Sequence, residues 1–252
     1  MSDVAGGENF YDKVAAKFGE YSTGAHWMTE YRNGAPEAVF LEKLSGVGGA
    51  DQYALDAGSG DGSFTLRIAP YFGQVVGIEL SRGMLEVAQR RQVERGIENV
   101  HFELRDASNT GFPAASFDVV YSRRGPTGYG EFARLLTRGG SVLHVGIGEQ
   151  DAGELVRVFG RGQGFDYRSN SWLGRSRDRQ EAAGLSIVYA EEFVYDEYYP
   201  TYADLDLFLQ GVPIFEDFDP VADRELLSDI LAVGARASGA PRRLEIWGRT
   251  AR

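Results

Sequence analysis

The sequence predicts an α/β fold in which a doubly wound, mostly parallel sheet carries helices on both faces. Short apolar runs alternate with helix-length runs between residues 50 and 148, and a glycine-rich turn follows the first apolar run. Repeated strand–helix units of this length favour parallel pairing, because each crossover helix returns the chain to the same end of the sheet. A chain of 252 residues is long enough for one such domain with additions.

The elements of this alternating region follow from hydrophobic spacing and from turn residues. Residues 8–22 have the apolar spacing of an amphipathic helix. A second helix is predicted over residues 36–44, with Pro36 in its first turn. The elements that follow are predicted, in chain order, as strand 52–56, helix 63–71, strand 74–79, helix 81–95, strand 100–104, strand 117–122, helix 130–136 and strand 141–147.

After Gly148 the pattern is less regular. The predicted elements here are helices 151–159 and 175–183 with a loop over 160–170 between them, a long strand 185–195, helices 201–210 and 220–236, and a final strand 243–248. A strand, an inserted segment and a terminal strand together predict an antiparallel edge of the sheet with an insertion within it.

Composition and charge exclude several classes of function. The net charge of −11 disfavours a general attraction to nucleic acid or to an anionic membrane. The sequence has no cysteine, so disulfides, thiolate metal ligands and a cysteine nucleophile are excluded. Its three histidines lack metal-ligand spacing, so we expect no metal. With no long apolar segment and no secretory signal pattern, we expect a cytoplasmic protein that does not enter a membrane.

The strongest local signal is the glycine turn Gly58-Ser59-Gly60-Asp61-Gly62 between a predicted strand and a predicted helix. Glycine allows a tight turn and the close approach of a ligand, which the N–H groups at the helix start are expected to face. By itself such a turn is equally compatible with no ligand. However, Glu79 ends the next apolar strand, where a carboxylate is placed to accept both ribose hydroxyls of a nucleoside.

The turn also resembles a known family. Residues 55–62, LDAGSGDG, resemble the first motif of class I S-adenosylmethionine-dependent methyltransferases, and they depart from the dinucleotide pattern because Asp56 precedes the glycines and Ser63 fills the third glycine position. Further resemblances are GIELS at 77–81 followed by Met84, RDA at 105–107, SFDVVYS at 116–122 and LTRGGS at 136–141. The run SRRGP at 122–126 is similar to that of uncharacterised bacterial members of small-molecule type.

The resemblance implies a Rossmann-like, seven-stranded sheet with an antiparallel last strand. It also implies S-adenosylmethionine as cofactor, with S-adenosylhomocysteine as product. Asp56, Gly58 and Gly60 would line the methionine and ribose part, Glu79 would hold the ribose, Met84 would pack on adenine, Asp106 with Ala107 would contact its edge, and Ser122 would lie near the sulfonium. The complete set of cofactor-binding residues so implied is Asp56, Ala57, Gly58, Ser59, Gly60, Glu79, Leu80, Met84, Asp106, Ala107 and Ser122.

The resemblance further suggests that residues 1–45 form a helical lid before a methyltransferase domain of residues 46–252. Within that domain, a helical insertion at about residues 196–240 is expected to cap the substrate, since residues 191–219 are rich in acids and aromatic rings. This segment could instead be a packed insertion with a solvated acidic face. Met84 could equally be a core residue of its helix.

Three residues are candidates for positioning or deprotonating the acceptor. Arg123 and Arg124 could clamp a carboxylate or phosphate, or they could pair with an acid such as Glu149. His26 is the candidate base because its pKa suits neutral conditions, although it could be an ordinary surface histidine.

The predicted function is methyl transfer to a small-molecule acceptor, by proximity and in-line displacement, in a monomer or homodimer. One alternative is an RNA base methyltransferase, for which the arginines between Arg157 and Arg179 would be the only basic face. The other is a non-catalytic nucleoside-binding module or a nicotinamide-dependent oxidoreductase.

Overall fold

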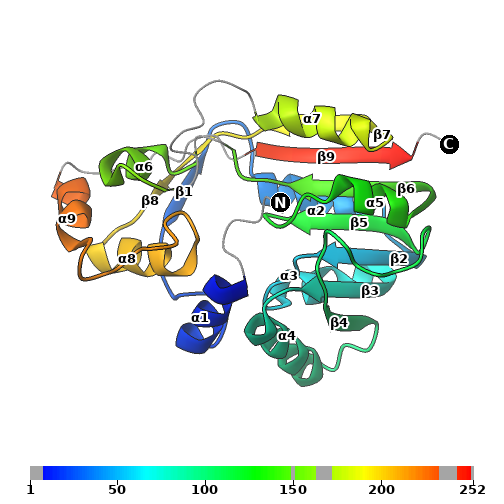
Figure 1. The fold of residues 1–252 in the computed structure, drawn as a ribbon, viewed down its shortest axis with the longest axis horizontal. Helices are drawn as coiled ribbons and strands as arrows, with labels where there is room; N and C mark the ends of the chain where they lie inside the picture. The colour runs from blue at the N-terminus through cyan, green and yellow to red at the C-terminus, as the bar shows by residue number, and fades with distance from the viewer. Residues whose placement is uncertain (1–7, 149–150, 163–171, 233–242, 251–252) are drawn as a thin grey trace.

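The computed structural model describes residues 8–148, 151–162, 172–232 and 243–250 (Figure 1). Its helices are α1 (Glu8–Phe18), α2 (Pro36–Gly46), α3 (Ser63–Ile68), the 3₁₀ turn η1 (Ala69–Tyr71), α4 (Arg82–Arg95), α5 (Tyr129–Leu135), α6 (Gly153–Phe159), α7 (Trp172–Ala182), α8 (Tyr202–Gly211) and α9 (Arg224–Ala232). Its strands are β1 (Met28–Tyr31), β2 (Gly49–Ala57), β3 (Phe72–Glu79), β4 (Val100–Leu104), β5 (Phe117–Arg123), β6 (Leu136–Val145), β7 (Leu185–Glu192), β8 (Tyr195–Tyr198) and β9 (Arg243–Thr250).

The main sheet has seven strands in the order β4-β3-β2-β5-β6-β9-β7. The five strands from β4 to β6 are joined by parallel pairings, whereas β9 pairs antiparallel with both β6 and β7. The order reverses on either side of β2, which lies between β3 and β5. In doubly wound sheets ligands bind outside the carboxyl ends of the strands at such a point, so the topology itself indicates where to look for a site.

Alternation of side chains along the parallel strands divides the core between two helical layers. One layer packs α2, α3 and α4 on the sheet, through residues that include Phe40, Leu66, Ala88, Val75 and Val119. The other packs α5 and the end of α7, through residues that include Phe132, Ala183, Leu55, Val76 and Val120. Strand neighbours such as Leu55 and Ala54 therefore face opposite layers, which confirms the predicted helices on both faces.

A separate body, the cap, consists of α6, α8 and α9 with their own apolar core, and it lies beyond the carboxyl edge of the sheet (Figure 1). Strand β8 connects it to β1 in an antiparallel two-stranded sheet. This pairing places residues 28–31 of the N-terminal segment against residues 195–198 of the cap.

The helical lid predicted for residues 1–45 is divided among three places. Helix α1 lies on α4, β1 joins the cap, and α2 packs into the sheet's core, with Phe40 and Leu44 fully buried. Similarly, the long strand predicted over 185–195 is two strands that belong to different sheets. Both differences have the same cause. A local sequence pattern shows that a segment is apolar, but it does not show which sheet or helical cluster the segment packs against. The loop predicted over 160–170 and Glu149 lie largely or wholly outside the described residues.

Candidate functional site

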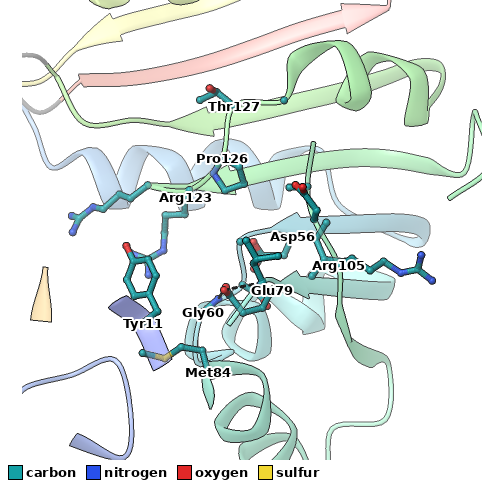
Figure 2. Close-up of a pocket in the computed structure, with 18 of the residues that line it drawn as sticks. Tyr11, Asp56, Gly60, Glu79, Met84, Arg105, Arg123, Pro126 and Thr127 are labelled. Atoms are coloured by element: carbon teal, nitrogen blue, oxygen red, sulfur yellow. Dashed lines mark hydrogen bonds between the residues drawn. The ribbon is translucent and has the colours of Figure 1, made fainter. Parts of the chain in front are cut away.

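A cavity of about 330 Å³ lies at the carboxyl edge of the parallel strands, at the point where the strand order reverses (Figure 2). Its walls come from the segments that follow β2, β3, β4 and β5, together with side chains of α1 and α4. The residues that line it are Tyr11, Tyr21, Asp56, Gly58, Ser59, Gly60, Asp61, Phe64, Ile78, Glu79, Leu80, Met84, Arg105, Asp106, Ala107, Ser108, Arg123, Arg124, Gly125, Pro126, Thr127, Gly128 and Arg179.

The turn after β2 requires glycine for two reasons. Gly58 and Gly60 have φ angles of +86° and +54°, which residues with a Cβ adopt at a cost. A Cβ on Gly58 would also lie 2.7 Å from Cδ of Pro126, in the loop after β5. By contrast, a Cβ on Gly60 would meet no atom of the described residues within 4 Å. Gly58 is therefore needed where two loops touch, and Gly60 where the turn faces open space.

The backbone N–H groups of this turn are used within the protein. Gly58 and Ser59 both donate to the carbonyl of Ile78, at 3.0 and 2.9 Å. Gly60 donates to Oε2 of Glu79 at 2.8 Å (Figure 2). The expectation that these amides face a ligand is therefore wrong for these three residues, because the neighbouring strand β3 accepts all three N–H groups. The turn offers a ligand glycine surface and side chains.

Glu79 ends β3, and three backbone N–H groups hold its carboxylate. Besides Gly60 on Oε2, the N–H groups of Leu80 and Ser81 donate to Oε1, each at 2.9 Å. A carboxylate has about four acceptor positions, so roughly one remains open toward the cavity. Burial raises the pKa of Glu79, and the three N–H donors oppose that rise.

Asp56 lies under the turn and is almost fully buried. Its Oδ2 accepts the hydroxyl of Thr65 in α3 at 2.7 Å. Burial raises the pKa of Asp56 to about 6, although the hydrogen bond from Thr65 lowers it. This carboxylate lines the cavity and at the same time fixes α3 to the end of β2.

Several side chains are suited to a nucleoside. The Ser59 hydroxyl is buried at the cavity wall and has no hydrogen-bond partner in the described part of the chain, as expected for a group that binds a ligand. Met84 and Ala107 offer buried apolar surface to the cavity, and Leu80 is partly exposed there. Asp106 accepts the N–H and hydroxyl of Ser108, each at 2.8 Å, which orients its carboxylate at the cavity rim.

Met84 is a core residue that also lines the cavity, so its place is compatible both with packing on adenine and with a purely structural role. Its side chain is 1% exposed and packs in an apolar cluster with Val14 and Ala15 of α1, and it also lines the cavity. Figure 2 shows Met84 and Tyr11 on the opposite side of the cavity from Pro126 and Thr127.

Arg123 and Arg124 both line the cavity and share one acid, Glu37 at the start of α2. Nη2 of Arg124 lies 2.8 Å from Glu37 and Nη1 of Arg123 lies 3.4 Å from it. Arg123 also stacks on the ring of Phe64. Arg124 has a φ of +56°, a strained conformation for a side chain other than glycine. No motif or residue spacing in the sequence indicates that Glu37 pairs with Arg123 and Arg124.

Three predicted residues, Ala57, Ser122 and His26, are not among those that line the cavity, and Ala57 is fully buried in the core. Ser122 is fully buried, and a Cβ on Gly125 would lie 2.9 Å from its hydroxyl, so Ser122 lies beneath the loop after β5. The His26 side chain is 86% exposed, and its Nδ1 lies 3.3 Å from Asp204 in the cap. Neither the sulfonium role of Ser122 nor the base role of His26 gains support from this geometry.

Tyr11 and Tyr21 bring the N-terminal segment to the cavity. Their rings lie 6.0 Å apart, and both side chains line the cavity wall. Burial raises the pKa of Tyr11 well above its ordinary value, and the charges of Tyr21 and Glu79 add to that rise, so its phenol keeps its proton. The clustering of aromatic residues in this segment was the only sign in the sequence of this contact.

Comparison of the sequence with known proteins shows similarity to methyltransferases. Residues 54–140 match the sequence profile of a family described as a methyltransferase domain. The chain is 33% identical over 103 residues to the uncharacterised methyltransferase YcgJ of Bacillus subtilis, covering 38% of this chain and 41% of that protein. It is 36% identical over 98 residues to the aklanonic acid methyltransferase DauC of a Streptomyces species, covering 35% of this chain and 44% of that protein.

These alignments span less than half the length of either relative. Among solved structures, the fold is similar to that of the [4+2]-cyclase SpnF, with a TM-score of 0.62 and 18% identity over 99% of this chain and 98% of that one. The family profile spans residues 54–140, which include most of the residues that line the cavity, whereas the similarity in structure covers 99% of the chain.

Proposed function

Because the chain carries a class I S-adenosylmethionine-dependent methyltransferase domain, we propose that the whole protein transfers a methyl group to a small-molecule acceptor. The observation that carries the proposal is the joined arrangement of Gly60, Glu79 and the cavity beside them. It provides an oriented carboxylate next to a turn with space for a ligand, as nucleoside binding requires.

Different residues of the cavity would contact different parts of the cofactor. The open acceptor position of Glu79 would take a ribose hydroxyl, so one strong hydrogen bond replaces the two expected from the sequence. Met84, Ala107 and Asp106 would surround the adenine, while the unpartnered hydroxyl of Ser59 would bind the methionine part.

When bound, the sulfonium supplies a methyl group that is already activated for displacement. The protein's own contribution is then to hold the acceptor in line and to exclude water. Tyr11, Tyr21 and Phe64 provide apolar walls for this purpose. A base is required only for an acceptor that carries a proton at working pH.

The acceptor would lie between the loop after β5 and the N-terminal segment, where Arg123 and Arg124 line the cavity. We infer that Arg124 contacts the acceptor, since a strained backbone at a cavity wall is a frequent feature of functional sites. Its pairing with Glu37 limits the clamp hypothesis, because an anionic acceptor would have to compete with that carboxylate.

Two described arginines of the Arg157–Arg179 stretch, Arg161 and Arg179, are engaged within the protein, which disfavours a role for them in binding RNA. Arg161 pairs with Asp217 and Asp223 of the cap, at 3.1 and 2.8 Å. Arg179 donates to the carbonyl of Thr127 and stacks on Tyr129. These cations are thus used to hold the cap and the loop after β5.

The experiment that tests the proposal uses S-adenosylmethionine with a labelled methyl group. The purified protein is incubated separately with a small-molecule extract and with total RNA, and the label is followed into products. We expect label in a small molecule. Label in RNA alone would establish the alternative acceptor, and label in neither, despite donor binding, would support a non-catalytic or other activity such as the fold hosts in SpnF.

A further inference from the structure

The carboxylate of Asp12 in α1 contacts the start of α4, whose N-cap residue Ser81 follows Glu79 by two positions. Oδ1 of Asp12 accepts the hydroxyl of Ser81 at 2.5 Å and the N–H of Gly83 at 2.9 Å. The hydroxyl of Ser81 in turn accepts the N–H of Met84 at 3.1 Å, as the N-cap of α4. Asp12 therefore completes the cap of a helix to which it does not belong.

The contact is built into the packing of the two helices. A Cβ on Gly83 would lie 3.0 Å from Cβ of Ala15 and 3.2 Å from Oδ1 of Asp12, so the absence of a side chain there allows α1 to approach. Val14, Ala15 and Met84 form the apolar cluster beside this point. The carboxylate is thus held at a fixed place by a close helix crossing.

Ser81 links this cap to the cavity. Its hydroxyl donates to Asp12 while its N–H donates to Oε1 of Glu79. One residue therefore connects a side chain of α1 with the carboxylate that also holds Gly60. A displacement of Asp12 would release Ser81 and, through it, one of the three N–H groups that orient Glu79.

A second set of contacts fixes the other end of the same segment. The N–H of Tyr21 donates to Oδ2 of Asp61 at 3.1 Å, within the glycine turn. Arg91 of α4 pairs with both Asp61 and Glu20. The segment from Asp12 to Tyr21 is therefore attached on both sides of the Gly60–Glu79 pair, with Tyr11 and Tyr21 at the cavity wall.

We propose that Asp12 is a positioning residue that couples the seating of α1 over the cavity to the orientation of Glu79, and so to the binding of a ribose hydroxyl. The inference rests on the proposed function, since it takes the ligand to be a nucleoside. Asp12 belongs to the N-terminal segment and is not among the described residues that line the cavity. The proposal gives this residue a role in ligand binding.

The test compares Asp12→Asn with the wild-type protein and with Asp51→Asn, an exposed acid at the opposite end of β2. Binding of S-adenosylhomocysteine, adenosine and 2′,3′-dideoxyadenosine is measured by calorimetric titration. We expect Asp12→Asn to weaken the first two by roughly tenfold, because Ser81 and Gly83 would then donate to a neutral amide oxygen instead of a carboxylate oxygen. Binding of dideoxyadenosine, which lacks both the 2′- and the 3′-hydroxyl and so the one that Glu79 would bind, should change by less than about twofold. Asp51→Asn should change the binding of none of the three ligands.

Equal weakening of adenosine and dideoxyadenosine would overturn the proposal, because a role in packing alone would affect both nucleosides. Unchanged binding of all three ligands would overturn it as well. The double variant with Ser81→Ala and Asp12→Asn should bind the ligands no more weakly than the more severe single variant does. Additive losses of affinity would instead show that the two residues act independently.

Failure of the proposed function has a different signature. In that case the wild-type protein binds none of the three ligands, and the positioning role falls with it. Amide hydrogen exchange of α1 in the ligand-free protein still reports whether Asp12 holds the helix: faster exchange in Asp12→Asn than in Asp51→Asn would then assign the contact to folding alone.

Discussion

Glu79 accepts the N–H of Gly60 at 2.8 Å, across the gap between the end of β3 and the turn after β2. Since β2 and β3 are neighbouring parallel strands, this bond joins the two segments that we propose to hold the methionine and ribose parts of the cofactor. The carboxylate and the turn therefore form one structural unit, and substitutions in either should affect ligand binding together.

Glu79→Gln is expected to weaken binding of S-adenosylhomocysteine by roughly 10- to 100-fold, the value of a hydrogen bond to a charged group. The amide offers one acceptor oxygen, and its NH₂ group would face N–H donors that now meet a carboxylate oxygen. Calorimetry measures the change, with Glu94→Gln on the exposed surface of α4 as the matched control. Equal affinities of the two variants would contradict the assignment.

The two glycines of the turn should respond differently to alanine. In Gly60→Ala the new Cβ meets no atom of the described residues, so we expect a loss of only about 1–2 kcal/mol of unfolding free energy from backbone strain, with a large loss of ligand affinity. In Gly58→Ala the Cβ meets Pro126, so we expect a larger loss of stability. Urea unfolding and ligand titration separate the effects, and the reverse order of stabilities would show that the turn is misassigned.

Arg124→Gln should affect the acceptor and not the donor. For an acceptor identified by the labelling experiment, we expect KM for that acceptor to rise roughly tenfold while the Kd for S-adenosylhomocysteine stays within about twofold. Glu37→Gln is the companion variant, because it removes the acid that Arg124 and Arg123 share. A changed Kd for the donor product with an unchanged acceptor KM would place Arg124 on the other side of the site.

His144 should make stability depend on pH without taking part in the reaction. Burial and, to a lesser extent, the charge of Arg179 together lower its pKa to about 3, while its Nδ1 bonds the Tyr129 hydroxyl at 3.0 Å. A histidine whose folded-state pKa lies below the ordinary value of 6.5 contributes stability that is present above pH 6.5 and lost as the pH falls toward 3.

At pH 5 the wild-type protein should accordingly have lost about 2 kcal/mol of unfolding free energy relative to pH 7.5 through this group. His144→Gln should lack that share of the pH dependence, as measured by urea unfolding at both values. Identical pH dependence in the two proteins would mean that His144 titrates normally.

The sequence predicted the parallel core well because its signals are local. Glycines at Gly58 and Gly60, the acid Glu79 and the alternating strands all lie where the motif spacing indicates, and the cavity contains most of the predicted cofactor-binding residues. What could not be predicted depends on contacts between distant segments. Nothing near Glu37 indicates that it meets Arg123 at the end of β5 and Arg124 just after it, or near Asp12 that it caps α4.

The use of the turn's amides was also hidden from the sequence. A glycine-rich turn is compatible with N–H groups that face a ligand or face the next strand, and only the register of β2 against β3 decides between them. Likewise none of the four residues of β1 is buried, so its sequence shows no alternating strand pattern, and the strand is recognised only from its pairing with β8.

The most direct test of the account is a calorimetric titration of the wild-type protein with S-adenosylmethionine and S-adenosylhomocysteine, beside NAD as a competing nucleotide. A cavity organised by Glu79 and Gly60 should bind the first two at one site per chain and leave NAD unbound. Heat from NAD alone, or from none of the three, would contradict the assignment of this cavity.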